Sequence, residues 1–251
     1  MIVYHQEAFM ANEFLCATIK SNQNIYKNIN TKMASQISHI IYAKQLFDKL
    51  EKGELREGFF DNETIRKILT YKDDFLLGCV FPDVRLVAEN LARKDTHMFF
   101  NQVNLDFRNL SPFQSGWKFH VYCDMKREEI LNKYDFYEAI KNVENSWLAN
   151  KMLEDELIYD VYNNWEKLVN FFNDIPRINL LEGLSRESLE FWYAIISKYI
   201  EKKPDNKTMH IFIIKSKQEI QKADLVVEKI EKLRRNAPAE LILKKVFMEI
   251  V

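Results

Sequence analysis

Apolar residues recur along this chain at the three- and four-residue intervals that are typical of amphipathic helices. Residues 35–53 show the pattern between a capping residue, Ser35, and a terminating glycine, Gly53. The apolar face of this segment consists of Ile40, Ala43, Leu46, Phe47 and Leu50. We therefore predict a helix over this segment.

The same spacing predicts further helices along the rest of the chain. They begin after capping residues Asp61, Ser111 and Ser185. Residues 134–172 remain helical in pattern, and HIFIIK is expected to form a helix that follows Asp205. Residues 98–110 alternate poorly and are expected to be loop or extended.

Composition agrees with long elements and few turns. The chain has 251 residues, 47% of them hydrophobic, and only 5 glycines and 5 prolines. It contains no internal repeat and no low-complexity segment. We therefore expect an all-α, single-domain, multi-helix bundle over residues 1–251, with few or no strands.

The net charge and the absence of targeting signals argue against nucleic-acid binding, secretion and insertion into a membrane. The formal net charge is −1, which gives no sequence evidence for nucleic-acid binding. The N-terminus does not resemble a secretory signal, and no apolar run approaches 18 residues, so we expect a cytoplasmic protein without a transmembrane segment. Cys16, Cys79 and Cys123 lie within apolar runs and are expected to be buried thiols.

One pair of polar residues is placed so that both side chains could bind the same ion. His120 and Asp124 lie four residues apart on a predicted helix, on the same face as Phe113 and Trp117. Alone, such a pair is more often an ordinary surface feature. Because the aromatic residues indicate that this face is buried, the carboxylate needs a cation, a metal or several donors.

Three other residues are ordinary when each is taken alone. Asp83 follows Pro82 and could cap a helix over DVRLVAENLA, while His39 and His97 could be structural histidines. The five candidates together are His39, Asp83, His97, His120 and Asp124. Such nitrogen and oxygen ligands suit zinc or, less specifically, manganese or iron.

The order and spacing of these residues resemble the zinc-dependent phospholipase C family, which is related to the zinc-dependent single-strand nucleases. SHIIYAKQLFDKL resembles its early helix, FLLGCVFPDVR its Gly-x-x-x-Pro-Asp segment, and GWKFHVYCD its Gly-x-x-x-His-x-x-x-Asp helix. His97 matches the ligand between the last two segments. The resemblance implies an all-α fold of that type, with a metal-site half over 35–131 and a helical C-terminal half over 132–251.

The chain also departs from the family pattern. That pattern continues after the His-x-x-x-Asp helix with two histidines and a glutamate, whereas here no histidine follows Asp124 for 85 residues, until His210. The family also uses a processed N-terminal amino group as a ligand, whereas 38 residues precede His39. We therefore expect one zinc ion and at most two. A second ion would take His39, a bridging Asp124 and one more donor, such as Glu128, Asp135 or Glu138.

The resemblance implies hydrolysis of a phosphodiester, in a small molecule or a lipid head group, by metal-activated water. It makes Asp83 a candidate base as well as a ligand, and Arg85 and Lys94 are near enough in sequence to meet phosphate. An HD-domain-type phosphohydrolase is less favoured because no adjacent His-Asp dipeptide occurs. The alternative is a non-catalytic, partner-binding helical scaffold that retains a structural metal. Substrate and oligomeric state are not readable from the sequence.

Overall fold

A computed structural model describes residues 36–55, 60–143, 147–176 and 181–251. Every regular element in these ranges is a helix, and they contain no strand, which confirms the all-α prediction. They belong to one compact unit. Whether residues 1–251 form a single domain stays a prediction, because residues 1–35, including Ser35 and Cys16, lie outside the described part.

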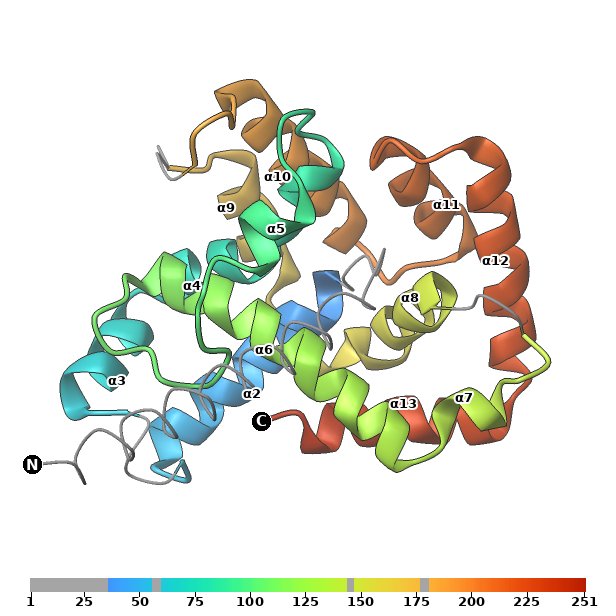
Figure 1. Ribbon diagram of the computed structural model, residues 1–251, viewed down its shortest axis with the longest axis horizontal. Coiled ribbons are helices and arrows are strands. Elements are labelled where there is room, and N and C mark those ends of the chain that lie inside the picture. Colours follow the sequence, from blue (N-terminus) through green and yellow to red (C-terminus); the bar gives the residue numbers. More distant parts are fainter. Residues whose placement is uncertain (1–35, 56–59, 144–146, 177–180) are drawn as a thin grey trace, which may run out of the picture. The chain divides into compact units, whose positions relative to one another are not determined.

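Figure 1 shows the order of the described helices. They are α2 (Gln36–Lys52), α3 (Asn62–Thr70), α4 (Lys72–Val80), the 3-10 helix η1 (Phe81–Leu86), α5 (Arg93–His97), α6 (Pro112–Lys133), α7 (Phe136–Ala139), α8 (Trp147–Ile158), the 3-10 helix η2 (Tyr159–Val161), α9 (Trp165–Asn173), α10 (Arg186–Ile200), α11 (Asn206–Lys215), α12 (Ile220–Arg234) and α13 (Ala237–Glu249). The predicted 35–53 helix is therefore confirmed over Gln36–Lys52, and HIFIIK is helical.

The predicted capping residues begin their helices as expected. Ser111 Oγ accepts a hydrogen bond from the Gln114 amide at 3.1 Å, and the Gln114 side chain accepts one from the Ser111 amide at 3.0 Å. Pro112 takes the first helical position, where its missing N–H is not needed. The Asp61 and Ser185 side chains cap α3 and α10 by accepting one hydrogen bond each, from the amides of Thr64 and Ser188. The longest described helix, α6, therefore starts at a residue fixed by local sequence.

Helices α4 and α6 pack closely at two glycines. A Cβ atom added to Gly78 would lie 2.0 Å from the Phe113 carbonyl oxygen, and one added to Gly116 would lie 1.9 Å from the Phe75 carbonyl oxygen. Both distances are impossible for real atoms, so only glycine permits this approach. This contact determines how closely α6 approaches the C-terminal end of α4.

The end of α4 is satisfied by side chains from other helices. Pro82 has no N–H, so α4 stops at Val80 and the chain tightens into η1. Three carbonyls of the last turn accept hydrogen bonds, in the pairs Leu77–Tyr193, Cys79–His120 and Val80–Trp192. Helices α6 and α10 are thereby tied to α4 through polar as well as apolar contacts.

One local prediction is wrong. Residues 83–92 do not form a helix capped by Asp83; they contain the end of η1 followed by turns. Asp83 is fully buried and accepts a hydrogen bond from Gln36 Nε2 at 2.9 Å. The carboxylate therefore points into the protein, and a tertiary partner replaces the expected backbone amides.

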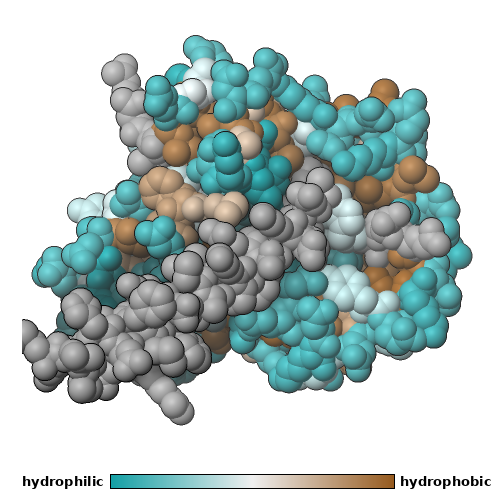
Figure 2. All heavy atoms as spheres, viewed as in Figure 1, coloured by the Kyte–Doolittle hydropathy of each residue, from teal (hydrophilic) through white to brown (hydrophobic). Residues whose placement is uncertain are grey.

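Helices α2 and α8 complete the surroundings of α6. Helix α2 contacts α4, α6 and α8, and α13 contacts both α6 and α8 (Figure 1). Cys79 and Cys123 are buried free thiols, as expected. Hydrophilic side chains cover much of the face shown in Figure 2, with apolar patches between them. No helix among the described residues combines the length and apolar character needed to cross a membrane.

Candidate metal centre

His120 and Asp124 lie one turn apart on α6 and face the interior. His120 Nε2 is 3.8 Å from Asp124 Oδ2. His120 is fully buried, whereas 12% of the Asp124 side chain is exposed. His120 Nδ1 lies 2.7 Å from the Cys79 carbonyl oxygen, which can only accept, so Nδ1 carries the proton. The Nε2 lone pair is therefore directed toward Asp124, as a metal ligand requires.

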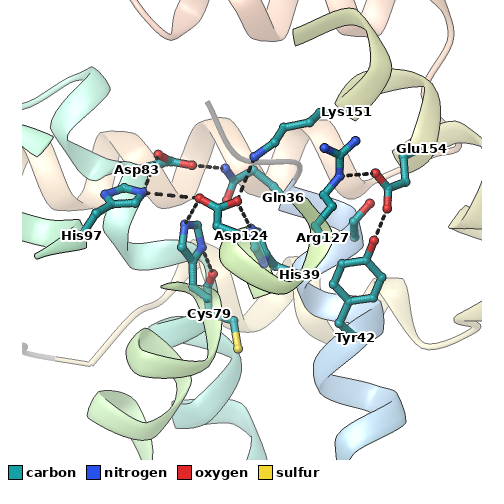
Figure 3. A network of polar contacts seen from close by, with 12 residues as sticks. Gln36, His39, Tyr42, Cys79, Asp83, His97, Asp124, Arg127, Lys151 and Glu154 are labelled. Atoms are coloured by element: carbon teal, nitrogen blue, oxygen red, sulfur yellow. Dashed lines mark hydrogen bonds and ion pairs between the residues drawn. The ribbon is translucent and has the colours of Figure 1, made fainter. Parts of the chain in front are cut away.

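His97, at the end of α5, connects Asp83 with Asp124. Its Nε2 atom lies 3.7 Å from Asp83 Oδ1 and 3.8 Å from Asp124 Oδ2 (Figure 3). His97 Nδ1 lies 2.9 Å from Thr96 Oγ1, which can donate onward to the Arg93 carbonyl oxygen at 3.5 Å. This arrangement favours a proton on Nδ1 and a free lone pair on Nε2.

His39 comes from α2 and stacks on His120, with ring centroids 3.9 Å apart. Its Nε2 atom lies 3.6 Å from Asp124 Oδ1. The structure thus brings all five predicted residues together in two overlapping groups that share His120. One group is His39, His120 and Asp124, and the other is Asp83, His97 and His120.

Several ligand atoms at this centre are buried without a hydrogen-bond partner. They are His97 Nε2, His120 Nε2 and Asp124 Oδ2. Buried polar atoms normally find a partner, so such a cluster needs an explanation. Ligand atoms around a tetrahedral zinc ion lie about 3.3–3.5 Å apart, given metal–ligand bonds of about 2.0–2.1 Å. Three separations, His97–Asp83 at 3.7 Å and His97–Asp124 and His120–Asp124 at 3.8 Å, exceed that spacing by only a few tenths of an ångström, and these pairs are therefore compatible with a shared zinc ion.

Three cationic side chains surround the carboxylates. Lys151 of α8 donates a hydrogen bond to Asp124 Oδ1 at 2.8 Å and is almost fully buried. Arg85 of η1 lies 3.3 Å from Asp83 Oδ1, and Arg93 of α5 lies 3.9 Å from Asp124 Oδ2. The arginines differ from Lys151 because 14% and 26% of their side chains are exposed.

These charges determine the protonation states of the centre. Burial raises the pKa of Asp83, but the Arg85 guanidinium together with His120 and His97 outweighs burial and holds that pKa below its usual range. For Asp124, burial again opposes the attraction of Lys151, and the pKa falls well below the usual value. Burial lowers the pKa of His120 to about 3 and lowers that of His97 as well. Anionic carboxylates and neutral imidazoles are the forms that bind metal ions.

A second buried polar network lies beside the first (Figure 3). Arg127 of α6 pairs with Glu154 of α8, with Nε 2.6 Å from Oε2, and donates to Asn150 Oδ1 at 2.8 Å. Tyr42 of α2 also donates to Glu154. Glu154 is therefore neutralised by a guanidinium and does not belong to either ligand group.

The additional donors suggested by the sequence lie elsewhere. Glu128 accepts a hydrogen bond from Tyr137, and Asp135 and Glu138 are exposed. None of them occurs in the ligand groups found among the described residues. The chain turns at Asp135, which has a left-handed backbone. The expectation that one of them completes a second zinc site is therefore not supported.

Sequence reasoning missed three residues of the centre. Gln36, Arg93 and Lys151 reach it from α2, α5 and α8. Lys94, named as a possible phosphate contact, is exposed, and its neighbour Arg93 faces the centre instead. Gln36 had a readable signal, since it precedes His39 by three residues and therefore shares its helix face. Lys151 had none.

Comparisons of the chain with protein-family models, with curated proteins and with solved structures found no match.

Proposed function

We propose that this chain is a divergent relative of the zinc-dependent phospholipase C family and a metal-dependent phosphodiester hydrolase. The observation that carries the proposal is the meeting of His97 Nε2, His120 Nε2 and Asp124 Oδ2 in the interior without hydrogen-bond partners. Asp83 lies next to His97 and supplies a further anionic oxygen. Zinc is the expected metal because the donors are imidazoles and carboxylates.

When bound, zinc would polarise a phosphoryl oxygen and lower the pKa of a coordinated water toward neutrality. The chain's own residues would hold and orient that ion. Cys79 and Thr96 fix the tautomers of His120 and His97 through their hydrogen bonds. Gln36 orients Asp83 by donating to Oδ2. Loss of such outer contacts typically weakens metal binding about 10- to 100-fold.

Asp83 suits the role of ligand better than that of general base. Its Oδ2 atom already accepts a hydrogen bond from Gln36, and Oδ1 faces Arg85 and His97. Its pKa lies below the usual range, so it would accept a proton from water poorly. We therefore keep Asp83 in the proposed centre as a ligand beside His97.

The two arginines support an anionic substrate. Arg85 and Arg93 are the partly exposed cations at the margin of the centre, and Arg85 Nε is buried without a hydrogen-bond partner. Guanidinium groups bind phosphate oxygens with two parallel hydrogen bonds. A phosphoryl group placed beside the ion could meet both side chains. The substrate proposed is accordingly a phosphodiester of a small molecule or a lipid head group.

A non-catalytic scaffold with a structural metal is the second candidate. Four protein ligands are usual in structural zinc sites, whereas catalytic sites keep one position for water. The presence of four candidate ligands at this centre therefore favours a structural role. Asp83, His97, His120 and Asp124 would complete such a closed set. In that case zinc would stabilise the fold without turnover.

Hydrolysis of bis-p-nitrophenyl phosphate by the zinc-loaded protein tests the two candidates. The hydrolase predicts turnover that a chelator removes and that zinc restores. Arg93→Met should lower turnover at least tenfold while the bound zinc is unchanged, and Lys94→Met, the exposed neighbour, serves as the matched control. Bound zinc without turnover on this and on other phosphodiesters supports the scaffold, and a protein without zinc contradicts both.

A further inference from the structure

The two ligand groups differ in how their shared carboxylate is used. Asp124 Oδ2 faces His97 and His120 and has no hydrogen-bond partner. Asp124 Oδ1 faces His39 at 3.6 Å and accepts the hydrogen bond from Lys151 at 2.8 Å. One carboxylate oxygen is therefore available to an ion, while the other is already bound to a cation of the chain.

The Lys151 ammonium has little freedom to leave this position. Its side chain is 4% exposed, and the neighbouring residues on its helix, Asn150 and Glu154, are also buried. Glu154 is engaged by Arg127, so Asp124 is the carboxylate to which Lys151 donates. A buried ammonium requires an anionic partner, and moving it away from Asp124 would separate it from the carboxylate to which it donates.

Charge also limits the number of metal ions. Among the residues that the structure describes, and apart from the partly exposed Arg85 and Arg93, the buried charged groups of the centre are the Asp83 and Asp124 carboxylates and the Lys151 ammonium, which together carry one net negative charge. A single divalent ion changes that net charge from −1 to +1. A second divalent ion would add two more positive charges within a few ångströms of Lys151, with no further carboxylate in either ligand group.

We propose that the Lys151 ammonium takes the place of a second divalent cation beside His39 and Asp124, and thereby limits the centre to one ion. This inference rests on the metal centre proposed above. It assigns His39 a positioning role, through its stacking on His120 and its approach to Asp124, and not a role as ligand. Lys151 also holds Asp124 so that Oδ2 faces His97 and His120.

Zinc stoichiometry of the folded protein tests this assignment, measured by elemental analysis after equilibration with excess zinc and gel filtration. The wild type should hold one equivalent. Lys151→Met removes the ammonium and leaves Oδ1 beside His39, so the variant should hold two. Lys151→Arg keeps a cation and should hold one. His39→Asn should leave the wild-type count at one, but should return the Lys151→Met variant from two equivalents to one.

The outcomes separate the inference from the function on which it rests. One equivalent in both the wild type and Lys151→Met overturns the role of Lys151 and leaves the metal centre intact. Two equivalents in the wild type, falling to one in His39→Asn, also overturn that role. If Lys151→Met does not fold, the zinc contents of the wild type and of His39→Asn are compared to test the role of Lys151, because neither protein carries the Lys151 substitution. No zinc in the wild type overturns the metal centre and the inference together.

Discussion

Gly78 and Gly116 lie on opposite sides of the crossing of α4 and α6, and each faces backbone of the other helix. A Cβ atom at either position would fall about 2 Å from a carbonyl oxygen across the contact, at 2.0 Å for Gly78 and 1.9 Å for Gly116. The crossing places Cys79 against His120, whose ring is oriented by that hydrogen bond. The two glycines therefore determine the geometry of the candidate centre as well as the packing of the core.

Gly116→Ala is expected to destabilise the protein by about 3 kcal/mol or more, since overpacking costs typically about 1–3 kcal/mol and here backbone must move. The measurement is the free energy of unfolding from denaturant titration. Gly53→Ala is the control, because no atom lies within 4 Å of its added Cβ. Its backbone φ of +68° still disfavours alanine, at a cost of about 1–2 kcal/mol. Equal losses in the two variants would show that the helix crossing tolerates a side chain.

Zinc is expected to raise the midpoint of thermal unfolding. A ligand present at 100 times its dissociation constant stabilises the folded state by about 2.7 kcal/mol. His97→Asn should abolish the shift because it removes a ligand atom from the centre. His210→Asn should retain it, because His210 pairs with Asp224 on α12 and belongs to neither ligand group. A zinc-induced shift that survives in His97→Asn would place the ion elsewhere.

The Arg127–Glu154 pair is expected to matter for stability and not for the zinc count. Both side chains are buried, and Arg127→Met leaves Glu154 as an uncompensated charge, which typically costs about 3–5 kcal/mol. Lys141→Met is the control, because Lys141 and Glu138 form an exposed pair and such pairs contribute about 0–1 kcal/mol. Loss of bound zinc from folded Arg127→Met protein would instead show that the Arg127–Glu154 pair supports metal binding.

Local sequence patterns predicted much of this structure. The caps at Asp61, Ser111 and Ser185 and the apolar face of α2 are set by neighbours within a few residues, and these helices are present. The spacing of His120 and Asp124 likewise fixed their common face. Their meeting with Asp83 and His97 could be expected from the resemblance alone, because nothing in the intervening sequence determines it.

The features that were missed depend on packing between distant segments. Lys151 reaches Asp124 only because α8 packs on α2 and α13, which both contact α6, and no local pattern around Lys151 indicates that contact. Asp83 was predicted as a ligand, and only the alternative that it caps a helix is wrong. The competing partner is Gln36, 47 residues earlier in the chain. Rules that consider only neighbouring residues in the sequence cannot identify a hydrogen-bond partner at that separation.

The central claim is that Asp124, His97 and His120 hold a metal ion, and elemental analysis of purified wild type and Asp124→Asn at matched protein concentration tests it most directly. Because Asp124→Asn also weakens the contact with Lys151, His97→Asn is measured beside it, and circular dichroism checks that both variants are folded. We predict one equivalent of zinc in the wild type and less than a tenth of an equivalent in either folded variant, since each loses a ligand atom. A wild type without zinc, or unchanged zinc in folded Asp124→Asn protein, would contradict the account.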